Sequence, residues 1–110
     1  MIALIRIDDR LIHGQITTAW MAFSGARRIV IASDDVAKDS MRKMVVNATA
    51  PKGTLVLDLK SAAESLRSSP DKIFVICTNP AEVLALAQDG VEFNSVIVGN
   101  LGGLAQKAET

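Results

Sequence analysis

The residues best suited to chemistry lie in one short stretch of the chain, from Asp8 to Gln15. His13 is the only histidine in the sequence, and an imidazole with its ordinary pKa of about 6.5 offers a neutral, nucleophilic nitrogen at cellular pH. Arg10 precedes it by three residues, and a guanidinium can hold phosphate oxygens through two parallel hydrogen bonds. The stretch therefore suggests a histidine that handles phosphate.

The neighbours of His13 fit this interpretation and also allow a plainer one. Asp8 and Asp9 could hold the imidazole in one tautomer, or they could form surface ion pairs or cap the next helix. Gly14 would let the backbone approach a bound anion closely while the following helix presents its free amides. A lone histidine beside apolar residues is nevertheless more often a structural group than a reactive one.

Five short apolar runs predict the strands that position this stretch. Such continuous runs are typical of parallel strands buried on both faces. The predicted strands span residues 2–7, 29–32, 54–57, 73–77 and 96–98.

Four segments between these runs show helical patterns. Two have apolar residues at i, i+3, i+4 and i+7, which predicts one buried face on each. A third helix is predicted over 61–68, and a fourth begins where Asn79 caps and Pro80 takes the first turn. The residues expected to face inward are Ile16, Ala19, Trp20 and Phe23 in the first, Met41, Met44, Val45 and Ala48 in the second, and Val83, Leu86 and Ala87 in the fourth.

Alternating strands and helices predict a single α/β domain over residues 1–110, an open and mostly parallel sheet with helices on both faces in three layers. Ligands of such sheets lie beyond the carboxyl ends of the strands. Polar residues follow all five runs, at Asp8-Asp9-Arg10, Ser33-Asp34-Asp35, Asp58, Thr78-Asn79 and Gly99-Asn100.

Several other residues have structural interpretations. Asp34 and Asp35 are expected to serve as N-cap and first-turn residues of a helix. Cys77 ends an apolar run, which favours a buried core thiol over a nucleophile. The pair Arg27-Arg28 is expected to be solvated, although on the active-site side it could dock an acidic partner.

Composition excludes several classes of function. Twelve acidic and twelve basic residues give a net charge of zero, so no global field attracts nucleic acid or an anionic membrane. Neither a nucleotide phosphate loop nor the Cys/His spacing of a zinc site is present, so no cofactor or metal is expected. No apolar run reaches the roughly 20 residues that span a bilayer, and the single cysteine fits a reducing compartment, so a cytoplasmic protein is expected.

The stretch from Arg6 to Gln15, with Thr17-Thr18-Ala19-Trp20 after it, closely resembles the start of the IIB component of mannose/fructose/sorbose-class sugar phosphotransferase systems (PTS). The resemblance continues to about Leu104. Its further landmarks are the stretch 33–39, Ala50-Pro51-Lys52-Gly53, Thr78-Asn79-Pro80 and Val98-Gly99-Asn100.

This resemblance implies a phosphotransferase that accepts phosphate on Nδ1 of His13 from a phosphohistidine of the IIA protein or domain. The group then passes to a sugar imported by the membrane components IIC and IID. Arg10, Gly14 and Gln15 would hold the phosphate oxygens, while Asp8 or Asp9 would fix the ring or the loop. The resemblance also implies a homodimer associated peripherally with the permease.

The chain departs from the family at its end, because complete members continue past Gly99-Asn100 with further β structure. An unpaired sheet edge is therefore expected, which would favour association. Two alternatives remain open. One is an inactive relic of a IIB subunit. The other is a receiver-like module phosphorylated on aspartate, with Asp8-Asp9 and Asp58 after its strands but without the lysine that such modules use.

Overall fold

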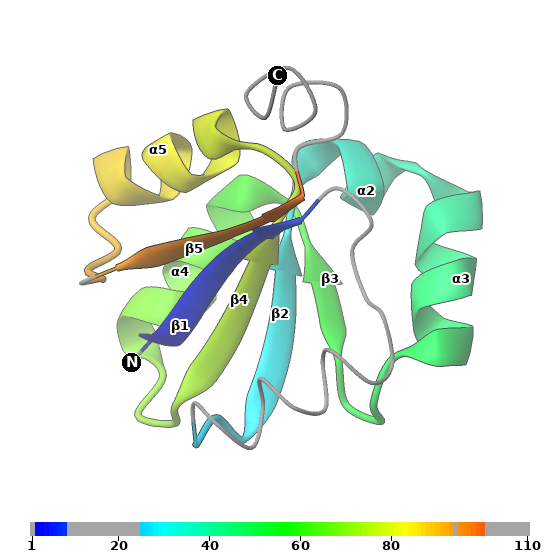
Figure 1. Ribbon diagram of the computed structural model, residues 1–110, viewed down its shortest axis with the longest axis horizontal. Coiled ribbons are helices and arrows are strands. Elements are labelled where there is room, and N and C mark those ends of the chain that lie inside the picture. Colours follow the sequence, from blue (N-terminus) through cyan, green and yellow to red (C-terminus); the bar gives the residue numbers. More distant parts are fainter. Residues whose placement is uncertain (1, 9–24, 94, 101–110) are drawn as a thin grey trace.

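The computed structural model describes residues 2–8, 25–93 and 95–100, and its centre is a five-stranded sheet (Figure 1). The strands are β1 (Ile2–Asp8), β2 (Arg28–Ala32), β3 (Leu55–Leu57), β4 (Ile73–Cys77) and β5 (Val96–Asn100). Their order is β3-β2-β4-β1-β5, and every pairing is parallel. The predicted open parallel sheet is confirmed.

Burial differs between the centre and the sides of this sheet. All five residues of β4 are buried, as a strand with neighbours on both sides and helices on both faces should be. The described residues leave β3 and β5 with one paired neighbour each, and Leu55 and Val98 are 42% and 57% exposed. The expectation that all five strands are buried is therefore wrong for these two, because an apolar run does not reveal which strand lies at an edge.

Four described helices cover the sheet. They are α2 (Asp34–Lys38), α3 (Ser40–Thr49), α4 (Leu59–Ser68) and α5 (Pro80–Gln88). Asn79 caps α5 and Pro80 occupies its first turn, as predicted. The first predicted helix, with Ile16, Trp20 and Phe23, lies outside the described residues. Within the described part of the chain, no helix is long and apolar enough to cross a membrane.

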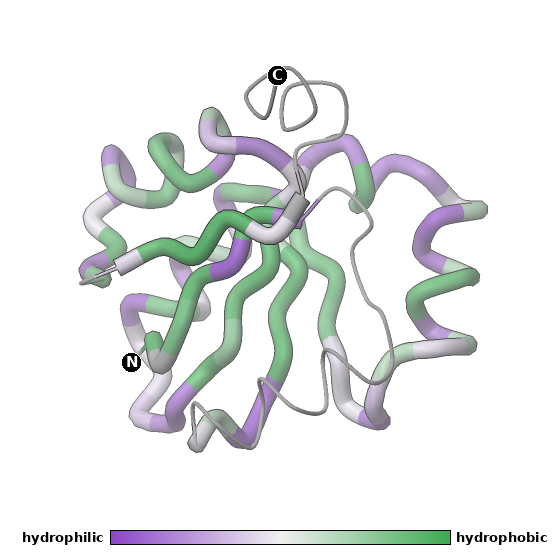
Figure 2. The backbone as a smooth tube through the Cα atoms, viewed as in Figure 1, coloured by the Kyte–Doolittle hydropathy of each residue, from purple (hydrophilic) through white to green (hydrophobic). Residues whose placement is uncertain are grey.

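The helices enclose two hydrophobic cores on opposite faces of the sheet, giving the predicted three layers. On one face, Ile7 and Val75 pack with Ala63 of α4 and Leu86 of α5. The core on the other face contains residues of the sheet and of α2 and α3, namely Leu4, Ile29, Ile31, Val36, Val46, Phe74 and Ile76. Figure 2 shows the sheet strands as the hydrophobic centre of the molecule. Alternate residues of β1 and β4 thus serve different cores, as the pleat requires.

The predicted inward faces of two helices need correction. In α3, Met41, Met44 and Val45 are 77%, 66% and 62% exposed, and Val46 is the residue that enters the core. Ala48 is exposed as well. In α5, Val83 and Leu86 are buried as expected, but Ala87 is exposed. Helical periodicity shows which residues share a face, whereas the direction of that face depends on how the helix is placed, and α3 packs mainly against α2.

Candidate functional site

The polar residues that follow the strands gather at one edge of the sheet. Parallel pairing brings Ile7 level with Cys77 and Ala32 level with Leu57, so the strands end together. Across the sheet, this carboxyl edge presents Asp58, Ser33 with Asp34, Thr78 with Asn79, Asp8 and Asn100. The prediction that these groups share an edge is confirmed. Asp9, Arg10, His13, Gly14 and Gln15 lie outside the described residues.

The strand order makes the ends of β1 and β4 one of the places on this edge where a binding crevice can form. From β1 the chain continues to β2 on the far side of β4, whereas from β4 it continues through α5 to β5 on the far side of β1. Adjacent strands whose connections leave in opposite directions form a switch point, where open α/β sheets bind ligands. Asp8 and Thr78 stand at the two strand ends that flank this point.

Asp8 is buried and paired with a cation from its own strand. It is 2% exposed, and Nε of Arg6 donates to its Oδ2 at 3.3 Å. Arg6 and Asp8 lie two and four residues after Leu4 on β1, and alternate residues of a strand point to the same face. Both side chains therefore lie on the face of the sheet whose core contains Leu4. The acidic charge of Asp8 is thus compensated where the chain leaves β1. Sequence reasoning missed Arg6, although a charged residue inside a buried apolar run was the available signal.

A second network fixes the end of β4. Glu82 is 6% exposed, and its Oε1 accepts hydrogen bonds from the backbone N–H of Thr78 at 2.6 Å and from the Thr78 hydroxyl at 2.8 Å. The Asn79 side chain in turn accepts from the N–H of Glu82 at 3.0 Å. The pattern is related to a capping box, but the buried glutamate accepts from Thr78, the residue before the N-cap, and not from the N–H of Asn79 itself. Glu82 was missed as well, although the spacing Asn79-x-x-Glu82 was a readable signal.

Replacement of Glu82 by alanine is expected to lower the free energy of unfolding by about 1–3 kcal/mol, because it leaves the Thr78 N–H and hydroxyl without their acceptor. Glu82→Gln keeps an acceptor oxygen and should retain more than half of that stability. Urea unfolding followed by circular dichroism measures both. The matched control is Glu64→Ala at an exposed position of α4, for which a change within about 0.5 kcal/mol is expected. Equal losses at Glu82 and Glu64 would contradict the role of the network.

Cys77 belongs to the core, as predicted. It is fully buried next to Val75 and Ile7. Desolvation, helped by the charge of Glu82, raises the pKa of the thiol from 9.0 to about 12. Because the thiolate is the reactive form, Cys77 is held in its inert form at neutral pH.

Iodoacetamide at pH 8 should therefore modify Cys77 roughly a thousandfold more slowly in the folded chain than in urea, since the thiolate fraction falls by about three powers of ten. The raised pKa also has a stability consequence. The thiol ionises near pH 9 in the unfolded chain and near pH 12 in the folded chain. Its contribution to the free energy of unfolding is therefore complete below pH 9 and is lost as the pH rises through 12. Mass spectrometry of timed samples measures the modification. Rapid labelling of the folded chain would refute the buried, protonated thiol.

The acidic residues at the ends of β2 and β3 act as helix caps. Ser33, and not Asp34, is the N-cap of α2, and its buried hydroxyl accepts from the N–H of Val36. Asp34 and Asp35 occupy the first turn, and Oδ1 of Asp34 accepts from the N–H of Leu59 at 2.8 Å. The prediction that Asp34 and Asp35 stabilise the start of a helix is thus confirmed, but the N-cap residue is Ser33 and not one of the two aspartates.

Asp58 caps α4. Hydrogen bonds from Ser61 lower the pKa of this carboxyl, and the bond from the Ser61 backbone contributes more than the bond from its side chain. The sheet order places β3 three strand spacings from β1, which is about 14 Å. Asp58 and Asp8 are therefore too far apart to share one metal ion. Among the described residues, no three His, Cys, Asp or Glu side chains are grouped so that they could hold a metal.

The basic pair Arg27-Arg28 lies away from the carboxyl edge of the sheet. Arg28 is the first residue of β2, so it stands at the amino end of the strand, and its Nε lies 3.7 Å from Oδ2 of Asp71. Arg27 and Arg28 are both exposed. The solvated interpretation is confirmed, and docking on the active-site side is excluded for this pair.

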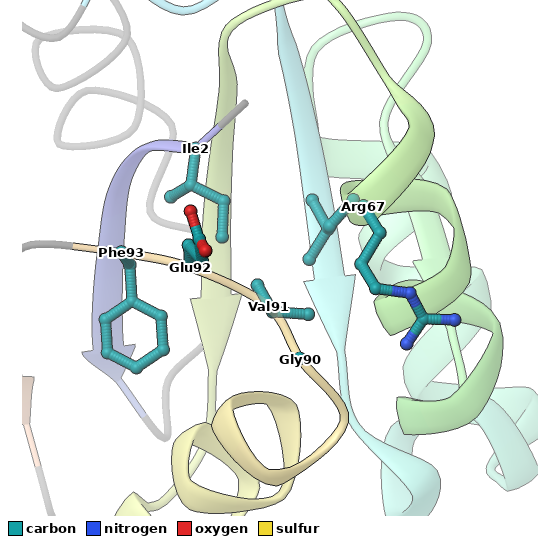
Figure 3. A pocket seen from close by; sticks show the side chains of 7 residues that line it. Ile2, Arg67, Gly90, Val91, Glu92 and Phe93 are labelled. Carbon is teal, nitrogen blue, oxygen red and sulfur yellow. The ribbon is translucent and has the colours of Figure 1, made fainter.

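A cavity of about 610 Å³ also lies at the amino end of the sheet (Figure 3). Arg67 reaches it from α4, while Ile2, Glu92 and Phe93 line it from β1 and from the segment before β5. The Arg67 guanidinium donates to the backbone carbonyl of Asp89. The cavity is therefore separated from Asp8 and Thr78 by the length of the strands.

The order of the strands and the polar edge define a class of protein, the open α/β domains that bind ligands at a switch point of a parallel sheet. Within that class, a family described as "PTS system sorbose subfamily IIB component" matches residues 2–109. The chain belongs to this family, which confirms the resemblance seen in the sequence.

Similar proteins agree with this assignment. The sorbose-specific EIIB component of Klebsiella pneumoniae is 38% identical over 94% of this chain and 65% of its own length, and that of Lacticaseibacillus casei is 40% identical over 97% and 66%. The crystal structure of the Klebsiella pneumoniae IIBSor domain superposes with a TM-score of 0.85 at 36% identity, covering 93% of this chain and 66% of that one. The chain thus spans about two thirds of the length of these relatives.

Proposed function

We propose that this chain is the phosphoryl carrier of a sugar phosphotransferase system, taking phosphate from a phosphorylated IIA protein or domain onto His13 and giving it to a sugar. The observation that carries the proposal is the family match over residues 2–109, which includes the stretch with His13. The switch point at the ends of β1 and β4 supports it, because the segment with His13 begins directly after β1.

The chemistry needs only bonds to phosphorus. The neutral Nδ1 of His13 attacks the phosphorus of the donor phosphohistidine, and the new N–P bond forms as the donor's N–P bond breaks and its electron pair returns to the donor imidazole. In the second transfer, a sugar hydroxyl attacks the phosphorus on His13, the new O–P bond forms as the N–P bond of His13 breaks and its electron pair returns to the imidazole, and the hydroxyl loses its proton to a base. Both steps depend mainly on in-line positioning and on stabilising the charge of the equatorial oxygens.

The roles of the neighbouring residues follow from their chemistry. Arg10, Gly14 and Gln15 hold the phosphoryl oxygens through a guanidinium, backbone amides and a side-chain amide. Asp9 orients the imidazole or the loop. The ion pair with Arg6 favours a loop-fixing role for Asp8 over direct contact with phosphate, because a buried, paired carboxylate does not face the anion.

The proposed partners are the IIA donor, the membrane components IIC and IID, and a second copy of the chain in a homodimer. The carrier would act on the cytoplasmic side, at the periphery of the permease. Relatives are named for sorbose, mannose, fructose and N-acetylgalactosamine, and these names support a hexose or an amino sugar as the substrate.

The test is phosphorylation of the folded chain by labelled phosphoenolpyruvate, the general phosphotransferase proteins and a cognate IIA, with omission of IIA as the control. Label that is stable in alkali and lost in acid is expected, since phosphohistidine behaves in this way. Label lost in alkali would indicate an acyl phosphate and revive the receiver-like alternative, which the roughly 14 Å between the ends of β1 and β3 disfavours. A folded chain without label would favour the inactive relic.

A further inference from the structure

β5 contains an irregularity beside the end of β1. Ile7 is level with Val98, but Asp8 is level with Asn100, so one residue of β5, Gly99, is skipped in the pairing. An extra residue on one strand is the mark of a bulge, and bulges next to functional sites redirect side chains. The irregularity thus lies at the carboxyl edge, at the strand end that carries Asp8.

The space above Gly99 is filled by Arg6. A Cβ atom placed on Gly99 would lie 2.5 Å from Nη2, 2.6 Å from Cζ and 2.8 Å from Nε of Arg6, closer than such atoms can approach. The same Nε donates to Oδ2 of Asp8 at 3.3 Å. The guanidinium therefore lies against the bare backbone of β5 on its way to the carboxylate, and any side chain at position 99 would occupy its place.

The ion pair that this space permits is largely enclosed, since the side chains of Arg6 and Asp8 are 11% and 3% exposed. A buried carboxylate without its cation carries a strong, weakly screened field. At the end of β1 that field would repel an anionic phosphoryl group approaching the switch point. Compensation of Asp8 is thus an electrostatic requirement of the edge as well as a structural contact.

We propose that Gly99 is a positioning residue of the phosphoryl edge: its missing side chain leaves the room in which Arg6 reaches and neutralises Asp8. The proposal rests on the proposed function for its effect on transfer, whereas the effect on charge can be measured without any transfer. Arg6 is the movable partner, because the clash is with the end of a flexible side chain and not with backbone. Gly99→Ala should therefore leave the fold in place and displace the guanidinium.

The test is a double-mutant cycle of Gly99→Ala, Arg6→Ala and the two together, with Val98→Ala on the same exposed strand as the control. Two quantities are measured: the kcat and KM of phosphate acceptance from IIA, and the NMR titration midpoint of His13, whose signals are unambiguous because it is the only histidine. Circular dichroism checks that each variant folds.

Gly99→Ala and Arg6→Ala are each expected to lower kcat/KM roughly tenfold and to raise the pKa of His13, because the carboxylate of Asp8 loses the hydrogen bond and the nearby positive charge of Arg6. In the Arg6→Ala background, Gly99→Ala should change neither quantity further, and Val98→Ala should resemble the wild type. A Gly99→Ala variant with wild-type values, or with the same loss in both backgrounds, would overturn the proposal. Failure of the wild type to accept phosphate would overturn the proposed function, while the His13 titration would still decide the role of Gly99.

Discussion

Replacement of His13 by alanine is expected to reduce phosphate acceptance by a factor on the order of 10³ or more, to the background of the assay. The reason is that His13 supplies the nucleophilic nitrogen of the proposed reaction, and the chain has no second histidine to take its place. Labelling from phosphoenolpyruvate through IIA, followed over time, measures the loss. Far-ultraviolet circular dichroism and urea unfolding should show an unchanged fold.

Arg10→Ala provides a graded comparison for this result. A residue that only stabilises the phosphoryl oxygens should slow transfer by roughly 10–100-fold, while the final extent of labelling on His13 is retained. Normal acceptance by His13→Ala would remove the assignment of the acceptor. Equal, complete loss in both variants would instead mean that Arg10 is required for acceptance itself, and its role as an auxiliary phosphate contact would be wrong.

The largest expected effect on stability is at Phe74, in the central strand β4. Its side chain is completely buried in the core that also contains Leu4, Ile31 and Val36. Phe74→Ala removes most of a large side chain and leaves a cavity that the surrounding sheet cannot close, which costs about 3–5 kcal/mol. Domains of this size have a total free energy of unfolding of about 5–15 kcal/mol, so this loss is a large fraction of the stability of the fold.

Phe93→Ala is the matched control, because Phe93 is only partly buried beside the cavity at the amino end of the sheet. We expect its cost to be smaller than that of Phe74→Ala by about 2 kcal/mol. Urea unfolding of both variants and of the wild type gives the comparison. Similar midpoints for the two variants would mean that the core around Phe74 relaxes far more than a packed sheet should.

Much of the fold could be predicted because its signals are local. The run at residues 73–77 is a strand with the predicted bounds, and Asn79-Pro80 begins a helix as predicted. A strand buried on both faces must be apolar throughout, and a capping residue acts within one turn. Signals of this kind do not depend on distant parts of the chain.

Other features could not be predicted because they depend on placement. The apolar residues of α3 share a face, but that face is exposed and Val46 enters the core instead. Leu55 and Val98 belong to apolar runs, but their strands have only one described neighbour each. The pattern within an element gives no information about which elements lie beside it.

The sequence by itself determined the alternation of strands and helices, the family, and the edge of the sheet at which polar groups gather, because parallel strands must end their carboxyl sides together. His13 and Arg10 as acceptor and phosphate contact remain predictions of the sequence. Only the tertiary structure decided that β1 and β4 are neighbours, that Arg6 neutralises Asp8 and that Gly99 leaves room for it. These contacts join residues as far apart as 6 and 99, and their register depends on the packing of the whole sheet.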